Sequence, residues 1–397
     1  MQLTETKLRP TPAVTGNVSG LRVAVNHYWF NGYGGGGERV VETLAEIFPQ
    51  ADFFCLLAVK DKAPPALRGR RLYTSFVDRI PGAKRWHRHL LPLYPFALEQ
   101  FDFSDYDVVI SSESGPAKGV ITPPRTCHIC YCHSPMRYIW DMYHESRRSM
   151  NPITRAIFSL TAHYMRLWDL STAARVDHFV ANSRYIASRI RKYYRRESRV
   201  INPPVNVSAG YIARDVGDHY LVVSRLVPYK RVDLAIEACN RLQRPLRIIG
   251  SGPEYKALRK IAGPTIKFLG RLEEQSLREN YAHCRALLFP GEEDFGIVPV
   301  EAQSYGRPVI AYGQGGALET IAGEFADDSD AANCTGVFFE QPDVGSLRDA
   351  ILRFERVENQ FRPEFIRRSV ERFSEERFKL EFTSYVREKV EQLADVI

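Results

Sequence analysis

The sequence lacks any long apolar run. No uninterrupted stretch approaches the roughly 18 residues that a membrane-spanning helix needs. The first twenty residues contain Lys7 and Arg9 but not the apolar segment of a secretory signal. From these two absences we expect a cytoplasmic protein.

Paired cysteine motifs are missing too. The seven cysteines are scattered, and only Cys127, Cys130 and Cys132 lie close together, with two histidines beside them. A zinc site would need a second ligand pair at a matching spacing, and the sequence has none. Because free cysteine behaves as a small apolar residue, residues 126–132 are more typical of a buried strand. We therefore expect no zinc site.

The fingerprint of a nicotinamide-dependent oxidoreductase is also absent. The first strand-to-helix turn has no ordered Gly-x-Gly-x-x-Gly followed about 20 residues later by an acid for the ribose. Two Asp-x-Asp pairs, Asp105/Asp107 and Asp328/Asp330, resemble ligands for a divalent metal. The first pair precedes its strand and the second lies in a polar loop, so both are interpreted as turns. The sequence predicts chemistry without a metal or another cofactor.

Positive charge is concentrated in one half of the chain. Residues 1–205 contain 28 Lys and Arg against 17 Asp and Glu, a net +11, whereas the whole chain carries +7. An anionic partner is therefore expected for the first half. The pI near 9.0 by itself also suits a non-enzymatic nucleic-acid-binding protein. That alternative lacks a motif in which aromatic and basic residues recognise bases.

The length of 397 residues suits two domains of about 150 to 200 residues each. Strand and helix patterns alternate in both halves, which is typical of parallel sheets covered by helices. Strands are expected at residues 21–26, 108–111, 127–132, 178–181, 220–224, 246–250, 266–269, 286–289 and 309–311. Long helices are expected at about 153–176 and 183–194.

A proline pair predicts the domain boundary. Asn202-Pro203-Pro204 favours an extended link, because consecutive prolines exclude helix. We expect an N-terminal acceptor-side Rossmann-like domain at 1–204 and a C-terminal donor-binding one at 205–373. Residues 374–397 are predicted to form a helix that crosses back to the first domain. Ligands of doubly wound sheets bind beyond the carboxyl ends of the strands, so the site is expected in a cleft between the domains.

The segment 223–231, Val-Ser-Arg-Leu-Val-Pro-Tyr-Lys-Arg, contains the first candidate site residues. A strand is expected to end at Ser224, and a helix to begin near Lys230. Arg225 and Lys230 would then lie at a strand terminus, where two cations and a helix N-terminus can neutralise a diphosphate. A solvated basic loop is the alternative.

A second segment, 292–301, contains two carboxylates. Glu293 is expected in the loop before a helix, and Glu301 one to two turns inside that helix. A carboxylate accepts two hydroxyl hydrogen bonds well, which suits vicinal hydroxyls of a sugar or a ribose. On spacing alone, a helix cap and a surface charge explain the pair as well.

Together these segments resemble family 4 of the retaining glycosyltransferases, which has the GT-B architecture: two doubly wound, Rossmann-like α/β domains facing each other across a cleft. The C-terminal half shares Ser-Arg-Leu-x-x-x-Lys-Arg at 224–231, Ile-Gly-Ser-Gly-Pro-Glu at 249–254, the Glu pair at 293 and 301, and Gly-Gly-x-x-Glu at 315–319. The N-terminal half shares Gly-Gly-Gly-Glu-Arg at 35–39, Cys-His-Ser-Pro at 132–135, Asn-Ser at 182–183 and Asn-Pro-Pro-Val at 202–205.

The resemblance implies a role for each residue. Arg225 and Lys230 would bind the donor diphosphate, Glu293 the donor sugar and Glu301 the ribose. His133 would contact the sugar near the reacting carbon. Together with Arg225, Lys230 and Glu293 it makes up the implied catalytic set. The other donor-binding positions that the resemblance implies are Gly36, Gly37, Gly252, Gly270, Arg271, Leu272, Phe295, Gly296, Ile297 and Val298.

The glycines at 34–37 admit a close backbone approach, and the helix after them could seat a phosphate or the acceptor. Gly37 departs from the family pattern, because relatives often have alanine there. The family mechanism needs no enzymic nucleophile: the leaving phosphate helps to deprotonate the acceptor hydroxyl on the same face of the sugar. Arg225 and Lys230 would then stabilise the departing charge, as a metal does elsewhere.

The stretch 131–141 resembles bacterial mannosyltransferases that build O-antigen or exopolysaccharide units on polyprenyl diphosphate. That similarity favours GDP-mannose as donor and a saccharide or lipid-linked saccharide as acceptor. A UDP-sugar donor and a nucleotide-sugar epimerase remain open. The epimerase differs from a transferase because it converts donor in the absence of an acceptor.

Residues 84–96 begin with basic and aromatic side chains and continue with apolar ones. Such a stretch can rest on an anionic membrane, which would place the protein at the cytoplasmic face of the inner membrane. A buried helix with a charged start explains the same pattern.

Overall fold

The computed structural model describes residues 20–30, 35–59, 62–148, 150–324 and 331–395. They divide into two compact units. Unit 1 comprises the described residues up to Val180 together with Ile190–Arg199 and the chain from Lys379 onward. Unit 2 comprises Ala181–Arg189 and Val200–Phe378. Asp328 and Asp330, one of the two Asp-x-Asp pairs, lie outside the described residues, as does Gly34 of the glycine run.

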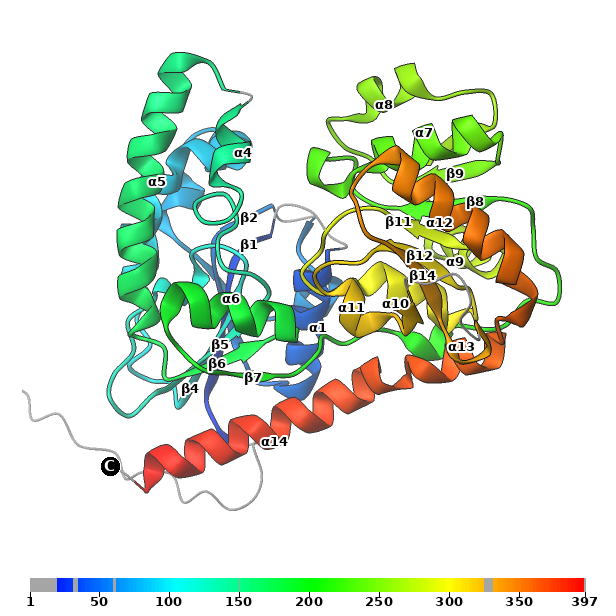
Figure 1. Ribbon diagram of the computed structural model, residues 1–397. Coiled ribbons are helices and arrows are strands. Elements are labelled where there is room, and N and C mark those ends of the chain that lie inside the picture. Colours follow the sequence, from blue (N-terminus) through cyan, green and yellow to red (C-terminus); the bar gives the residue numbers. More distant parts are fainter. Residues whose placement is uncertain (1–19, 31–34, 60–61, 149, 325–330, 396–397) are drawn as a thin grey trace, which may run out of the picture. The chain divides into compact units, whose positions relative to one another are not determined.

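The first sheet has seven strands in the order β3-β2-β1-β4-β5-β6-β7 (Figure 1). Its strands are β1 (Val23–Phe30), β2 (Asp52–Ala58), β3 (Leu72–Thr74), β4 (Val108–Glu113), β5 (Cys127–Cys132), β6 (His178–Ala181) and β7 (Ser198–Val200). β1 pairs in parallel with both β2 and β4, so the strand order reverses between β1 and β4. A crevice at such a reversal is where doubly wound sheets bind ligands.

The helices of unit 1 are α1 (Gly36–Ile47), α2 (Ala83–Trp86), α3 (Tyr94–Glu99), α4 (Tyr143–Arg148) and α5 (Pro152–Ala173). The 3-10 segment η5 (His87–Leu93) joins α2 to α3. α6 (Arg184–Tyr194) has residues in both units. The strands β2, β4 and β5 are almost continuously buried, as expected for a parallel sheet with both faces covered.

The second sheet repeats this plan in the order β10-β9-β8-β11-β12-β14-β13. Its strands are β8 (Tyr220–Val223), β9 (Leu246–Ile249), β10 (Ile266–Gly270), β11 (Leu287–Phe289), β12 (Val309–Tyr312), β13 (Gly323–Glu324) and β14 (Gly336–Phe339). The order reverses between β8 and β11, which pair in parallel. This reversal marks a second candidate ligand crevice.

Helices cover both faces of the second sheet. One buried cluster joins α7 (Val232–Leu242) and α12 (Val344–Val357) through side chains such as Ile236 and Ile351. A second cluster joins α9 (Glu274–His283) and α10 (Ile297–Ser304) through Tyr281 and Ala302. The other helices of this unit are α8 (Tyr255–Ile261), α11 (Ala317–Thr320) and α13 (Pro363–Ser369).

The last helix, α14 (Glu375–Ala394), begins in unit 2 and continues in unit 1. In unit 1 its Phe382 is fully buried, with its ring centroid 6.0 Å from that of Tyr131 on β5. α14 spans the residues after 374 for which the sequence predicts a helix. Within the described residues, no helix combines the length and the apolar composition that crossing a membrane requires.

Two Rossmann-like units with parallel sheets confirm the predicted fold class. The sequence patterns missed β2, β3, β7, β13 and β14, and they ended β1 four residues early, at Asn26 rather than Phe30. β1 continues because His27 is accommodated inside the sheet: its Nδ1 lies 3.2 Å from the carbonyl oxygen of Ser112 and 3.1 Å from its Oγ. A buried polar side chain is tolerated where it finds such a partner.

Candidate functional site

In unit 2 the candidate site lies in the loops that follow β8, β9, β11 and β12. Two glycines allow these loops to interlock. A Cβ on Gly250 would lie 1.8 Å from the carbonyl oxygen of Ser224, and one on Gly252 would lie 2.2 Å from that of Leu226. Only glycine fits such approaches, so these two glycines of the Ile-Gly-Ser-Gly-Pro-Glu motif hold the loop after β8 in place.

That loop carries Lys230. Residues Pro228–Lys230 form a 3-10 turn, and Arg231 adopts a left-handed conformation with φ 50° before α7 begins at Val232. The prediction of a helix starting near Lys230 was therefore wrong by two residues. Proline at the start of the turn fixes its backbone, and Lys230 closes the turn instead of opening the helix.

Lys230 Nζ forms an ion pair with Glu293 Oε1. The lysine side chain is 15% exposed and the glutamate side chain 21% exposed. A cation held this far from water needs a counter-charge, which the carboxylate supplies. The structure thus brings together two of the residues that the sequence assigned to one site.

The other strand-end loops fix Glu293. Its carbonyl oxygen accepts a hydrogen bond of 2.8 Å from the N–H of Gly316, and it forms a bridge with Gly315. A Cβ on Gly316 would lie 2.3 Å from Cα of Phe295, so this contact also requires glycine. The Gly-Gly pair at 315–316 therefore positions the backbone of the loop that carries Glu293.

Arg225 lies at the end of β8 and is exposed. Its guanidinium donates a hydrogen bond of 2.8 Å to the hydroxyl of Tyr229. Lys230 Nζ lies 5.4 Å from the centroid of the same tyrosine ring. Tyr229, which the sequence analysis did not select, therefore contacts both cations.

α10 contributes the second carboxylate. Its N-cap is Gly296, with φ 97°, and Pro299 lies in its first turn. Glu301 is the fifth residue of the helix, and its Oε2 accepts a hydrogen bond of 2.9 Å from the hydroxyl of Tyr281. The N–H groups of the first helical positions, Ile297 and Val298, have no partner within the helix, and such groups are typical anion binders at helix N-termini.

The remaining donor positions differ in what they expose. The Phe295 side chain is buried and packs edge-on against Phe373, with ring centroids 5.4 Å apart, so only its backbone can meet a ligand. Gly270 ends β10 with φ 68°, and its carbonyl oxygen accepts 2.8 Å from the N–H of Gly250. Arg271 is exposed, whereas Leu272 packs against the core.

Glu319, the acid of the Gly-Gly-x-x-Glu motif, stabilises a helix. Its two carboxylate oxygens each accept a hydrogen bond of 2.9 Å, one from the N–H of Arg184 and one from that of Tyr185. These are the first residues of α6, whose N–H groups lack partners within the helix. A carboxylate there also complements the helix dipole. The sequence motif gave no indication of this partner, because it lies 134 to 135 residues away.

In unit 1 the candidate site lies at the carboxyl ends of β1, β4 and β5. His133 follows β5, and its Nε2 lies 2.9 Å from Ser112 Oγ. Gly36 and Gly37 open α1, and a Cβ on Gly37 would lie 3.6 Å from His133 Nε2 and 3.4 Å from His27 Cε1. The structure therefore brings the glycine run next to His133, as expected for one site.

The hydrogen bonds in this group define a proton arrangement. His27 Nδ1 faces the carbonyl oxygen of Ser112, which can only accept, so Nδ1 carries the proton. Ser112 Oγ also lies within reach of that N–H and can therefore direct its own hydrogen to His133 Nε2. We expect His133 Nε2 to accept in this arrangement, with the proton of the neutral ring on Nδ1.

Both histidines are neutral at physiological pH. Burial lowers the pKa of His27 to about 3, with a further contribution from His133. Burial also lowers the pKa of His133 to about 4. His133 is therefore suited to hydrogen bonding with a neutral hydroxyl rather than to binding a phosphate as a cation.

A buried ion network supports the floor of this site. The carbonyl oxygen of Glu113 accepts 2.7 Å from the N–H of His133, and its carboxylate accepts 2.9 Å from the N–H of Lys118. Lys118 Nζ pairs with Asp169, which also accepts 2.7 Å from Trp140 Nε1. Lys118, Glu113 and Asp169 are all fully buried. The network fixes the chain immediately before His133.

The three cysteines of β5 are buried, as predicted for a strand. Among the residues that the structure describes, no three His, Cys, Asp or Glu side chains are grouped to hold a metal ion. Asp107 accepts 2.8 Å from the N–H of Arg22, and Asp105 lies 3.4 Å from the Arg22 guanidinium. Both aspartates are thus engaged in loop contacts.

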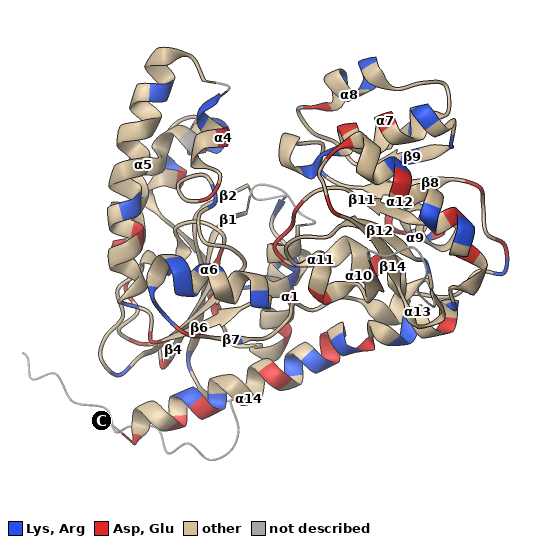
Figure 2. Ribbon diagram, in the orientation of Figure 1, with Lys and Arg blue, Asp and Glu red and all other residues tan. Residues whose placement is uncertain are grey.

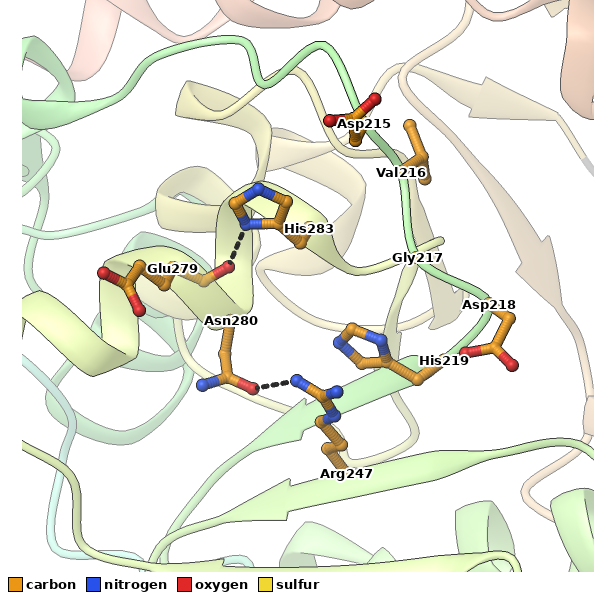
Figure 3. Close-up of a pocket in the computed structure, with 9 residues that line it drawn as sticks. All are labelled: Asp215, Val216, Gly217, Asp218, His219, Arg247, Glu279, Asn280 and His283. Carbon is orange, nitrogen blue, oxygen red and sulfur yellow. Dashed lines mark hydrogen bonds between the residues drawn. The ribbon is translucent and has the colours of Figure 1, made fainter.

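A hollow of about 420 Å³ lies elsewhere in unit 2 (Figure 3). It adjoins His219, just before β8, Arg247, near the start of β9, and His283, at the end of α9. In a parallel sheet this edge is opposite the carboxyl ends of the strands. The hollow therefore contains none of the predicted site residues.

Comparison with known sequences agrees with this arrangement. The family model described as "Glycosyl transferases group 1" matches residues 215–372, and the one described as "Glycosyltransferase Family 4" matches residues 34–209. The two matches together include all the predicted site residues. The chain belongs to the family 4 glycosyltransferases. The predicted family resemblance is confirmed.

Curated relatives of this glycosyltransferase include mannosyltransferases. The GDP-mannose-dependent monoacylated alpha-(1-6)-phosphatidylinositol monomannoside mannosyltransferase of Corynebacterium glutamicum is 36% identical over 32% of this chain and 35% of its own length. The O-antigen chain mannosyltransferase C of Escherichia coli is 29% identical over 35% and 42%, respectively. The matched part of the glycosyltransferase thus spans well under half the length of either relative.

Solved structures share the fold of the glycosyltransferase over almost its whole length. Anabaena HepE in complex with UDP has a TM-score of 0.65 at 15% identity and covers 92% of this chain and 99% of its own. The sucrose-phosphate synthase of Thermosynechococcus elongatus has a TM-score of 0.66 at 16% identity, with coverages of 92% and 98%. At these identities the likeness concerns the fold alone.

Sequence reasoning missed His27, Ser112 and Tyr229. A histidine inside the apolar strand β1, and two serines followed by a glutamate at the end of β4, were the available signals. Neither pattern indicates a partner. His27 and Ser112 are 85 residues apart in the sequence, and only the pairing register of β1 with β4 places them opposite each other. Only the sheet brings these side chains together.

Proposed function

We propose that the protein is a retaining glycosyltransferase that moves mannose from GDP-mannose to a saccharide or a polyprenyl-diphosphate-linked saccharide in bacterial cell-surface polysaccharide synthesis. The observation that supports this best is the Lys230–Glu293 ion pair at the switch point between β8 and β11. It joins a cation suited to a diphosphate with a carboxylate suited to sugar hydroxyls.

Donor binding would rearrange the charges of this pair. The diphosphate would take over Lys230 and the nearby Arg225, and Glu293 would become free to accept hydrogen bonds from the sugar. The N-terminal end of α10 adds N–H groups for the distal phosphate, and Glu301 accepts the ribose hydroxyls. Each of these groups would bind either the phosphate charge or the hydroxyls of the donor, and none would form a covalent bond with it.

The reaction would proceed without an enzymic nucleophile. The bond between the anomeric carbon and the phosphate oxygen breaks, and the electron pair leaves with the nucleoside diphosphate. The acceptor hydroxyl forms the new bond on the same face and passes its proton to the departing phosphate. Arg225 and Lys230 would stabilise the charge that accumulates there, and neutral His133 would hold a hydroxyl of the sugar.

The choice of mannose and GDP rests on the relatives. The Corynebacterium and Escherichia relatives are both named as mannosyltransferases. The name of the first also includes GDP-mannose and a phosphatidylinositol monomannoside. A lipid-linked acceptor also agrees with the net positive charge of residues 1–205. We further propose that the protein works without a metal cofactor, at the cytoplasmic face of the membrane and in peripheral contact with anionic lipid.

The decisive experiment is a melting-temperature panel with GDP-, UDP- and ADP-sugars, followed by a transfer assay with the donor that binds. A ligand at about 100 times its dissociation constant stabilises the folded state by roughly 2.7 kcal/mol. GDP-mannose is expected to give the largest shift, and transfer is expected to persist in EDTA. A larger shift with a UDP-sugar would reject the GDP assignment, and conversion of donor without acceptor would indicate an epimerase.

A further inference from the structure

α5 presents an exposed apolar face. Its large exposed side chains are 40% to 75% accessible and recur at intervals of three or four residues: Ile153, Ile157, Leu160, Tyr164, Leu167 and Leu170. This spacing puts them on one side of the helix, because an α-helix has 3.6 residues per turn. The opposite side, with Ala162, Met165 and Trp168, is buried in the core of unit 1.

This face carries almost no charge. The charged residues of α5 are Arg155, Arg166 and Asp169, and the aspartate is fully buried. The two arginines are partly buried and donate hydrogen bonds to the carbonyl oxygens of Met150 and Ile139. Figure 2 shows the contrast: α5 is tan over most of its length, whereas red and blue alternate along α14. Contiguous exposed apolar faces of this size usually mark an interaction site.

A second exposed apolar group lies on the neighbouring chain. The predicted stretch 84–96 forms α2, η5 and the start of α3, and η5 packs against α5. Within it Leu91 and Tyr94 are buried, but Trp86 and Phe96 are each 60% exposed. Phe96 lies one helical turn before Glu99, whose carboxylate accepts 3.1 Å from Trp168 Nε1 on α5. The helix face that carries Phe96 therefore borders α5.

Positive charge exceeds negative charge around the apolar face. Residues 78–99 contain four Lys and Arg against two Asp and Glu, and residues 145–169 contain four Arg against two Asp and Glu, of which Asp169 is buried. Lys84, Arg85 and Arg148 among these are exposed. An apolar helix face with aromatic residues and cations around it suits the boundary of an anionic bilayer, where basic residues are attracted to the lipid headgroups.

The size of the face argues against a second copy of the chain as its occupant. A helix of 22 residues is about 33 Å long and about 10 Å wide, so it presents roughly 330 Å². A stable protein interface needs about 800 Å² from each partner. Like charges on the margins of the face would also oppose each other across a symmetric contact.

We propose that α5 is the helix by which unit 1 docks on an anionic lipid surface, with Trp86 and Phe96 at the margin of the contact. This inference specifies the membrane contact of the proposed function and rests on it. It does not depend on the identity of the donor or the acceptor.

The test is co-sedimentation of the full chain with vesicles. Vesicles of phosphatidylcholine alone are compared with vesicles that contain 30% phosphatidylglycerol, at about 0.1 and 0.5 M salt. We expect binding to the anionic vesicles at low salt and at least tenfold weaker partitioning of the Ile157→Ser/Leu160→Ser double variant. The matched control is Leu380→Ser, which removes a 72% exposed leucine from α14 and is expected to bind like the wild type.

Two results would overturn the proposal. One is failure of the wild-type protein to bind anionic vesicles, and the other is equal binding by the double variant. Sedimentation velocity of the same proteins tests whether a second copy of the chain covers the face instead. A dimeric wild type and a monomeric double variant, without vesicle binding by either, would assign α5 to self-association. Transfer to a soluble acceptor is measured in parallel to keep the two proposals apart. A wild-type protein that shows no transfer refutes the proposed function, whereas the vesicle experiment tests α5.

Discussion

Ser112 Oγ lies 2.9 Å from His133 Nε2, and the two residues come from different segments of the first sheet. The serine hydroxyl can also accept a hydrogen bond from the N–H of His27, which leaves its own hydrogen available to His133. We expect this relationship to keep the proton of the neutral His133 ring on Nδ1. A residue that touches no substrate can thereby determine which atom of His133 donates a hydrogen bond.

Replacing Ser112 with alanine should lower kcat/KM by about tenfold, the equivalent of one hydrogen bond of about 1.4 kcal/mol, because both tautomers of His133 become accessible. Ser112→Thr, which keeps the hydroxyl, should restore the activity. The imidazole 15N chemical shifts of His133 report the tautomer directly.

The matched control for this prediction is Ser111→Ala. Ser111 is also buried on β4, but its Oγ lies 2.8 Å from His128 Nε2, on the other face of the sheet. Its loss should cost stability and leave kcat/KM close to the wild-type value. An unchanged His133 tautomer in Ser112→Ala would disprove the positioning role.

Lys230→Ala should lower transfer by at least 100-fold, because the diphosphate loses a preorganised cation and Glu293 is left without its counter-charge. The stabilisation by a nucleoside diphosphate in a melting experiment should disappear as well. Lys267→Ala, at an exposed position of β10 in the same unit, is the matched control and should behave like the wild type. Wild-type turnover in Lys230→Ala would remove this residue from the site.

The buried histidines predict a loss of stability in acid. Burial lowers the pKa of His27 to about 3 and the pKa values of His128 and His133 to about 4, below the 6.5 of an unfolded histidine. The unfolded chain therefore takes up more protons, so this contribution is complete above pH 6.5 and falls as the pH decreases toward 4.

Urea unfolding at pH 7.0, 5.5 and 4.5 measures this effect. The variant His128→Gln changes a residue away from the proposed site. It removes one titrating group from the difference in bound protons between the unfolded and the folded chain. It should reduce the slope of the free energy of unfolding by about 1.4 kcal/mol per pH unit between pH 6 and 4.5. An identical pH profile for wild type and variant would show that His128 is not held neutral.

Lys118→Met should destabilise the protein by about 3 to 5 kcal/mol, because it leaves Asp169 buried without a counter-charge. Burial raises the pKa of Glu113 to about 8 in spite of the nearby lysine, so Glu113 is largely neutral at pH 7 and the ion pair is that of Lys118 with Asp169. Adding Asp169→Asn should recover part of the loss in a urea titration. A double variant as unstable as the single one would contradict this pairing.

Gly37→Ala should stabilise the protein by about 0.5 to 1 kcal/mol, since alanine favours the first turn of α1. The new Cβ would meet its neighbours at 3.4 to 3.6 Å, which is ordinary contact distance. Gly252→Ala provides the opposite case, because its Cβ would lie 2.2 Å from the carbonyl oxygen of Leu226. Thermal unfolding of the two variants should give shifts of opposite sign.

The sequence by itself determined the fold class and most of the donor-side residues. Alternating strand and helix patterns indicate a doubly wound sheet wherever the strands are apolar throughout, and Glu293, Gly296 and Glu301 lie within nine residues of one another. Local patterns miss strands such as β14, Gly336–Phe339, which has only four residues and begins with glycine. They also place the start of α7 too early, because a 3-10 turn and a left-handed Arg231 intervene.

Only the tertiary structure decided which side chains act on one another. Lys230 and Glu293 are 63 residues apart, and His27 and Ser112 are 85 residues apart. Such pairs depend on strand order and register, which bring the carboxyl ends of neighbouring strands to one edge of a sheet. The exposed face of α5 was likewise decided there, because periodicity reveals an apolar side of a helix but not whether the rest of the chain covers it.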